Sequence, residues 1–248
     1  MKLMVGKEGI SRKLLSKLGS SSLVLFKFGM GSGGDILLKQ LFDAVSEDYY
    51  SIMISTHQTD EEMMTDLSHI GVGRPPELVS MLPSIHRRLS ELQKRDRFIS
   101  EGIMVTDILE ISSNSDDRIL PVKPHLEILS KITEISSKQV LPFNLVLDSI
   151  ADLVEETSRE EVVDRLRILK KALREKGGMA LVGCPLSYQV FSDQENTLFD
   201  AVIEVRAERT ADGWSRTLTF LNIKGSGEPP EEWQITTNKE VPAALEIE

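Results

Sequence analysis

The sequence predicts an α/β fold, with a mainly parallel central sheet, helices on both of its faces and a C-terminal antiparallel β-hairpin. Three observations predict it. Short apolar runs alternate with segments of helical periodicity through the first two thirds of the chain. A glycine-rich turn joins the first apolar run to the first helical segment. The last third instead alternates apolar and polar residues on both sides of a turn, as the strands of a hairpin do.

The parallel part begins with two strands and two helices. Residues 23–28 and 51–55 are short apolar runs, and each is expected to be a strand. Residues 34–45 carry apolar side chains at helical spacing and form the helix between these strands. Another helix begins at Asp60, because acidic side chains stabilise a helix N-terminus. This alternation of strand and helix is the pattern from which parallel sheets are built.

The middle of the chain is predicted to continue the alternation. Its expected elements are a helix over 75–98 with a basic stripe from Arg87 to Arg97, a strand over 102–111, a helix over 124–137 and a strand over 142–148. The basic stripe also contains Glu91 and Asp96, which favours a solvated helix face over a docking surface for an acidic partner.

The next helix has signals at both ends. Ser158 is its expected N-cap, and Glu161 is the partner of Ser158 in a capping box. The helix runs to Lys176, and Gly177 is its stop signal. A further strand is predicted over 178–183.

The end of the chain changes character. Residues 199–210 and 215–224 are the two strands of the predicted hairpin, which turns at 211–213. From about residue 225 the chain is rich in Pro and Glu and is expected to be an edge strand or an extended tail. No internal repeat divides the sequence, so we expect a single domain over residues 1–248.

Composition limits the function. The 248 residues have a formal net charge of -10, which argues against binding nucleic acid through bulk charge. No segment approaches the ~18 apolar residues of a membrane span, and the N-terminus lacks the apolar stretch of a signal peptide. A single cysteine, Cys184, suggests a reducing compartment and is expected to be buried and inert. We therefore expect a cytoplasmic protein with no membrane or nucleic-acid partner.

The glycine-rich turn has the layout of a phosphate-binding loop without its reactive side chains. In the motif G-x-x-x-x-G-K-[ST], backbone N–H groups surround the phosphates, the Lys neutralises them and the hydroxyl binds Mg²⁺. If Gly29 and Gly34 are the motif glycines, Asp35 takes the place of the Lys and Ile36 that of the hydroxyl residue. Lys39 lies one helical turn too late to replace the missing Lys.

A second register of the loop fits the downstream spacing better, and we prefer it. It places Phe28 at the first motif glycine, Gly34 at the Lys and Asp35 at the hydroxyl residue. Both registers lose the Lys and the hydroxyl, which makes the Walker A motif degenerate. The residues of this altered nucleotide-binding loop are Gly31, Ser32, Gly33, Gly34 and Asp35. The Asp35 carboxylate, in the first turn of a helix, is expected to occupy the place of a phosphate and to repel one, unless it serves only as a helix-stabilising acid.

Asp148 is the second candidate site residue. It ends a buried strand, as the Walker B acid that holds Mg²⁺ through water does, although Asp is also common as a turn residue there. In a parallel sheet, Asp148 and the glycine loop would meet at the carboxyl edge.

Together these segments resemble the KaiC-like ATPases of the RecA superfamily. The resemblance rests on residues 24–27 before the loop, Gln40 on the following helix, Ser55 with residues 61–63, residues 145–150 including Asp148 and Ser149, and the closing strands at 199–205 and 221–226. It covers residues 21–236 and implies a RecA-like P-loop NTPase fold, although 75–98 aligns poorly.

The resemblance also implies a mechanism whose parts can be compared with this chain. Family members bind ATP between the subunits of rings, a glutamate pair activates water, and a Lys-x-Arg finger from the neighbouring subunit reaches the last phosphate. His57 and Gln58 stand in place of the glutamate pair, and Asn222 and Lys224 in place of the finger. Asp148 keeps the Walker B acid.

These losses predict a non-catalytic, KaiC-like pseudo-ATPase that acts in protein–protein interaction or regulation, without a required cofactor. Its expected partners are copies of itself in a ring or another homo-oligomer, an active paralogue or a signalling protein. The alternative is an ATP-binding protein or slow ATPase that holds Mg²⁺ through Asp148 and could use His57 as a base. An unrelated α/β enzyme with another pocket is a third possibility. On the preferred register, Gly34→Lys with Asp35→Thr is expected to restore nucleotide binding.

Overall fold

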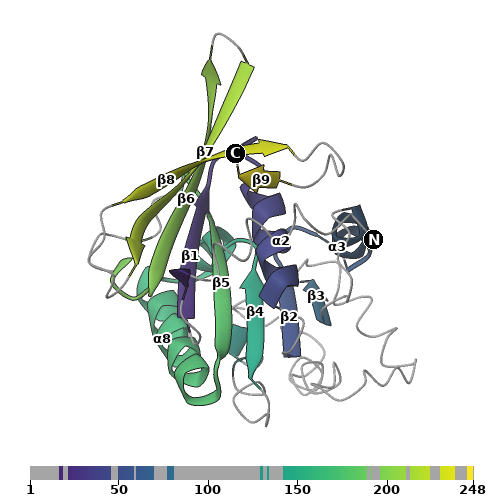
Figure 1. Ribbon diagram of the computed structural model, residues 1–248. Helices are drawn as coiled ribbons and strands as arrows, with labels where there is room; N and C mark the ends of the chain where they lie inside the picture. The colour runs from purple at the N-terminus through teal and green to yellow at the C-terminus, as the bar shows by residue number, and fades with distance from the viewer. Residues whose placement is uncertain are drawn as a thin grey trace.

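The computed structural model describes residues 17–18, 22–45, 50–58, 60–69, 77–80, 129–130, 133, 142–188, 191, 196–210, 213–223, 230–237 and 245–247. Within these ranges the strands are β1 (Ser22–Phe28), β2 (Tyr50–Ser55), β3 (Glu77–Ser80), β4 (Phe143–Leu147), β5 (Gly178–Pro185), β6 (Ala201–Thr210), β7 (Gly213–Ile223), β8 (Glu231–Thr237) and β9 (Leu245–Ile247). The helices are α2 (Gly34–Val45), α3 (Asp60–His69), α7 (Ala151–Glu156) and α8 (Arg159–Lys176) (Figure 1).

All the described strands belong to one sheet, in the order β3-β2-β4-β5-β1-β6-β7-β8-β9. The pairs from β3 to β6 are parallel, and those from β6 to β9 are antiparallel. The expected α/β class, with its mainly parallel sheet and C-terminal hairpin, is confirmed. From about residue 225, where an edge strand or an extended tail was expected, the chain adds β8 and β9 to the sheet, and β9 lies at its edge.

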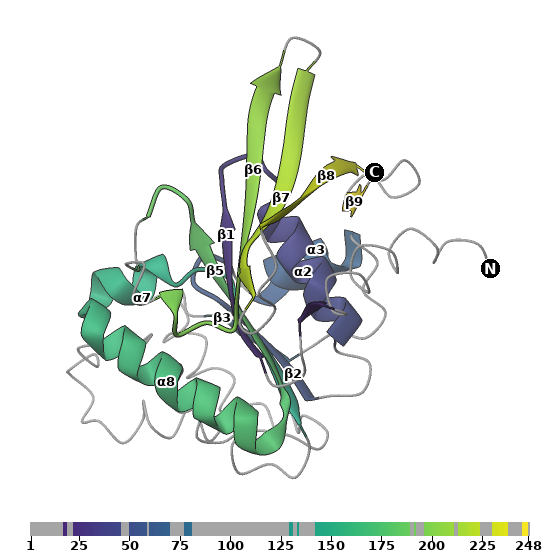
Figure 2. The ribbon, with the colours of Figure 1, turned by 60° about the vertical axis from the view of Figure 1, so that its left-hand side comes forward.

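Helices cover both faces of the sheet. Successive side chains of β1 point to opposite faces and therefore pack in two separate cores. Leu23 and Leu25 pack in a core that includes the apolar stripe of α8. Val24 and Phe26 pack in the other core, with residues from α2 and α3. Figure 2 shows α7 and α8 on one side of the sheet and α2 and α3 on the other.

The α8 boundaries follow their sequence signals. The Ser158 side chain accepts a hydrogen bond from the Glu161 N–H at 3.2 Å, as an N-cap does. Glu161 in turn accepts a bond from the Thr157 hydroxyl. Gly177, with φ of 85°, ends the helix and donates its N–H to the Leu173 carbonyl at 2.8 Å. The stop therefore depends on a backbone conformation that glycine adopts without strain.

One expected element is wrong. Within the helix expected over 75–98, Glu77–Ser80 form β3 and pair in parallel with β2. Pairing with a neighbouring strand outweighed the helical periodicity of this short segment. The rest of that helix with its basic stripe, and the strand expected over 102–111, lie outside the described residues. Leu129 and Thr133, within the expected 124–137 helix, are helical.

The sheet order sets up the candidate site. β5 lies between β1 and β4, and β4 pairs with β2 on its other side. Because these strands are parallel, the glycine loop, Asp148 and the residues after β2 meet at the same carboxyl edge. Beyond this edge, β6 and β7 continue as a two-stranded arm that projects from the body of the protein (Figure 1). No helix among the described residues is long and apolar enough to cross a membrane.

Candidate functional site

The glycine loop has the strand–turn–helix course of a phosphate-binding loop. β1 ends at Phe28, and Gly31 and Gly33 turn the chain with φ of 71° and 74°. The Ser32 N–H donates to the Gly29 carbonyl at 3.1 Å. Helix α2 then begins at Gly34, where the sequence placed it. Residues with side chains rarely adopt these positive φ values, which explains the glycines at 31 and 33.

Phe28 fills the space beside Gly34. A Cβ built on Gly34 would lie 2.2 Å from the Phe28 Cβ and 2.9 Å from its Cγ, whereas real Cβ contacts essentially never fall below 3.0 Å. The Phe28 Cβ is fixed to the backbone, so rotating the ring cannot remove this overlap. In the preferred register, these residues stand at the first motif glycine and the motif Lys. Phe28 and Gly34, the two residues that depart from the motif, are therefore neighbours, and the Phe28 side chain fits there because residue 34 has no side chain.

The loop also uses its own N–H groups. Gly29 donates to the Val205 carbonyl at 3.0 Å, and Gly34 donates to the Ser32 hydroxyl at 3.2 Å. Ser32 is fully buried, so its hydroxyl faces the loop interior. In a working phosphate loop such N–H groups bind the ligand. The space beside Gly34 is filled by the Phe28 side chain, and Asp35 is exposed.

Asp148 is held by the end of β2. Its carboxylate accepts hydrogen bonds from the Ser55 hydroxyl and, at 2.9 Å, from the Thr56 N–H. The Thr56 hydroxyl lies 3.1 Å from Asp148 Oδ1, the oxygen that also accepts the Thr56 N–H. On the other side, β5 approaches so closely that a Cβ on Gly183 would lie 2.0 Å from the Asp148 carbonyl. The Asp148 side chain, which was expected to bind Mg²⁺, thus connects the end of β4 to the end of β2 through hydrogen bonds.

A second carboxylate, Asp152, joins this cluster from α7. Its Oδ2 lies 2.7 Å from the Thr56 hydroxyl and 3.3 Å from His57 Nε2. The His57 side chain is 57% exposed, and its backbone N–H donates to the Ser55 hydroxyl at 3.2 Å. The sequence did not indicate Thr56 or Asp152, because neither belongs to a motif. Their only signal is position, since Thr56 follows β2 and Asp152 lies four residues beyond Asp148.

Gln58 belongs to a separate polar group. The buried Lys39 ammonium on α2 lies 3.1 Å from Gln58 Oε1 and 2.5 Å from the Asp66 carboxylate on α3. Gln58 Nε2 also donates to that carboxylate at 2.7 Å. The residue at the place of the family's second glutamate therefore links two helices, and Lys39 is committed to this link.

Asp66 provides a test of this link. Burial alone raises the pKa of its carboxyl, but hydrogen bonds from Gln58 and Lys39 and the lysine charge bring the pKa below the usual 3.8. A carboxyl whose pKa is lower in the folded state stabilises the fold at neutral pH and loses that contribution as the pH falls through the folded value. The wild type is expected to lose free energy of unfolding when the pH falls from neutral to about 3, and Asp66→Asn should lose less over the same range. Urea unfolding at both pH values measures this loss, and equal losses in both proteins would contradict the link.

The remaining predicted site residues are placed as follows. Ser149 is buried, and its hydroxyl accepts from the Ala151 N–H at 3.3 Å, which helps to begin α7. Asn222 is exposed on β7, and Lys224 lies outside the described residues. Cys184 is buried as expected. In the described part of the chain, no group of three or more His, Cys, Asp and Glu side chains could hold a metal ion.

The residues present do not fit ATP·Mg²⁺ bound as in a working P-loop. In the preferred register the Lys position holds Gly34, which has no room for a side chain, and Asp148 is bonded to Ser55 and Thr56. The arrangement builds an edge that joins strands β2, β4 and β5 with helices α2, α3 and α7.

Comparison with known proteins identifies the fold. No family model matches the sequence, and no curated protein matches it. Among solved structures, the chain is similar to the crystal structure of a KaiC-like protein from the hyperthermophilic archaeon Pyrococcus horikoshii OT3, with a TM-score of 0.57 and 14% sequence identity. The match covers 92% of this chain and 90% of the archaeal one. At this identity the likeness concerns the fold alone, and the chain has the RecA-like fold of the KaiC-like proteins.

Proposed function

We propose that this protein is a cytoplasmic RecA-fold pseudo-ATPase, which acts by binding other proteins and not by hydrolysing a nucleotide. The observation that carries the proposal is the contact between Phe28 and Gly34. A phosphate-binding lysine at position 34 would place its Cβ 2.2 Å from the Phe28 Cβ. The loop is therefore adapted to the loss of the lysine, and a single reverse substitution cannot restore it.

Two further features support the proposal. Asp148 accepts bonds from Ser55 and Thr56, so an Mg²⁺-bound water would have to compete with them. Gln58, at the place of a glutamate, has no carboxylate to activate water, and its amide is bound to Lys39 and Asp66. Loss of the lysine and of the base would each cost orders of magnitude in phosphoryl transfer.

Calorimetric titration with ATP·Mg²⁺ tests the proposal, with light scattering in the same buffer to read the oligomeric state. We expect no saturable binding to the wild type at millimolar nucleotide. The double variant Gly34→Lys/Asp35→Thr should also fail to bind, contrary to the expectation from sequence, because Phe28 still fills the space. Adding Phe28→Gly should create saturable binding of ATP·Mg²⁺, which the double variant lacks. Micromolar binding by the wild type would contradict the proposal.

The alternative is an ATP-binding protein or slow ATPase that holds Mg²⁺ through Asp148. One observation favours it, because Asp148 and the loop share the carboxyl edge of the sheet. It requires the Asp148 carboxylate to exchange its bond from the Thr56 N–H for a bond to a metal-bound water. Wild-type binding of ATP that needs Mg²⁺ and is lost in Asp148→Asn would support this alternative.

Copies of the chain remain a proposed partner, as do an active paralogue and a signalling protein. Light scattering distinguishes the first from the others, because a homo-oligomer gives a multiple of the 27.7 kDa chain mass without any addition.

A further inference from the structure

The arm formed by the ends of β6 and β7 is a sheet surface that lacks a cover in the described part of the chain. β6 pairs with β1 only as far as Val205, and β7 pairs with β8 only from Arg216 onward. Residues 208–210 and 213–215, which lie beyond both of these pairings, form a two-stranded ribbon that projects from the body of the sheet (Figure 1).

One face of the arm has a composition typical of a protein interface. Arg209 lies directly opposite Trp214, and Ala207 lies opposite Arg216. Strand alternation places these residues on the same face as Val205 and Leu218, which the α2-side core buries in the body of the sheet. On the arm Arg209 is exposed and the Trp214 side chain is 65% exposed, whereas Ala207 and Arg216 are partly buried.

The charges divide between the two faces of the arm. Arg206 and Glu208 lie on the opposite face from Trp214, and Arg206 binds Glu204 there. Among the described residues, the Trp214 face carries Arg209 and Arg216 and no carboxylate. This positive face stands out in a chain whose net charge is -10.

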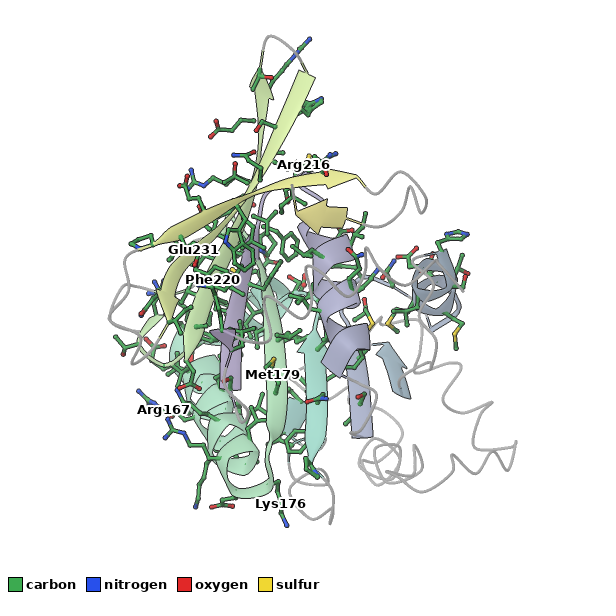
Figure 3. All side chains as sticks on the ribbon, in the orientation of Figure 1. Arg167, Lys176, Met179, Arg216, Phe220 and Glu231 are labelled. Atoms are coloured by element: carbon green, nitrogen blue, oxygen red, sulfur yellow. The ribbon has the colours of Figure 1, made fainter. Side chains whose placement is uncertain are left out.

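Arg216 joins this face to the glycine loop. Its Nε lies 3.5 Å from the Gly31 carbonyl, and Figure 3 shows Arg216 where the arm leaves the sheet. Met30, the neighbour of Gly31, is fully exposed at 101% of its reference area. Met30, Arg209, Trp214 and Arg216 together make what we call the arm face. Arg, Trp and Met are enriched at the centres of protein interfaces, where Trp and Arg often carry most of the binding energy.

We propose that the arm face docks an acidic segment of a partner protein, with carboxylates at Arg209 and Arg216 and apolar side chains on Trp214 and Met30. This inference rests on the proposed function, since it names the kind of partner through which a pseudo-ATPase acts. Charge complementarity selects an acidic segment, and the exposed apolar pair selects a polypeptide. Among the described residues a long nucleic acid would meet two arginines on this face, on a protein whose net charge is negative like its own.

Fluorescence anisotropy tests the proposal with three labelled probes: a peptide of alternating Glu and Leu, the same peptide with Lys for Glu, and a single-stranded oligonucleotide. We expect saturable binding of the acidic peptide and affinities about tenfold or more weaker for the other two. Trp214→Ala and Arg209→Glu should each weaken binding of the acidic peptide about tenfold or more. Arg209→Lys, which keeps the charge, should retain most of the affinity.

Two controls separate the arm face from general surface effects. Glu208→Ala changes the opposite face of the same strand, and Ile168→Ala removes an apolar side chain on α8 that is 51% exposed. Both should change the affinity less than about twofold. In a Trp233→Phe background only Trp214 reports by fluorescence, because the chain has two tryptophans, and its emission should shift to the blue when the peptide covers it.

The outcomes distinguish this inference from the proposed function. Absence of saturable binding of the acidic peptide, equal binding by Trp214→Ala, or tighter binding of the oligonucleotide would each overturn the inference. If the wild type binds ATP but loses the acidic peptide in Trp214→Ala, the pseudo-ATPase proposal fails and the arm face stands. If it binds neither ATP nor the peptide, the pseudo-ATPase proposal stands and the arm face fails.

Discussion

Gly34→Ala is expected to lower the free energy of unfolding by about 3 kcal/mol, because the new methyl group overpacks a filled space. The Cβ would lie 2.2 Å from the Phe28 Cβ, and relief requires the β1 end or the α2 start to move. Phe28→Gly removes the obstacle at its own cost of lost apolar burial. The double variant should therefore be more stable than the two separate effects predict, by about 1.5 kcal/mol or more.

Urea unfolding of the four proteins in this cycle measures the coupling, and Gly29→Ala is the matched control. A Cβ on Gly29 would meet Leu186 Cδ1 at an ordinary 3.5 Å, so this change should cost less than about 1 kcal/mol. If Gly34→Ala proves as mild as Gly29→Ala, or if the cycle is additive, the fitted pair that carries the pseudo-ATPase proposal does not exist.

Asp148→Ala is the second large effect, with an expected loss of about 3 kcal/mol. The substitution removes the acceptor of the bonds from the Ser55 hydroxyl and the Thr56 N–H, and Ser55 is fully buried. A buried donor that loses its acceptor costs the desolvation of that donor. Asp148→Asn keeps one acceptor oxygen and should cost about half as much.

Chemical denaturation monitored by circular dichroism measures this loss. Asp164→Ala is the control, because that carboxylate is 68% exposed and pairs with an exposed Arg167, so it should cost less than about 0.5 kcal/mol. An unchanged or increased stability in Asp148→Ala would indicate a carboxylate kept for a ligand, since functional groups often reduce stability. That result would favour the Mg²⁺-binding alternative.

Local signals predicted the elements that carry caps and glycine turns. The helix expected from about Gly34 to Val45 has these bounds in the structure, and Ser158 and Gly177 marked the ends of α8. These signals succeed because the hydrogen bonds they describe join residues a few positions apart. β3 was missed because its four residues are defined by pairing with β2, which sequence order alone does not reveal.

The sequence predicted where the candidate site residues lie in the fold, but not which side chains they contact. The sequence placed Phe28 and Gly34 at the first glycine and the Lys of the motif, but their fit depends on the course of the loop between them. The link between Lys39 and Asp66 joins residues on separate helices, and no spacing rule connects them. Asp148 was identified from its strand end, whereas its bonds to Ser55 and Thr56 follow from the parallel pairing of β4 with β2.

The central position of β1 affects how the chain is made. β1 pairs with β5 and β6, and β5 begins at Gly178, about 150 residues after Phe28. At a synthesis rate of about 5–20 residues per second, this apolar strand waits roughly 8–30 s before its first neighbour exists. During that time its unpaired edges can join other chains, and distant pairings of this kind also fold slowly. The sheet order thus leaves β1 without its native neighbours while more than half of the chain is being made.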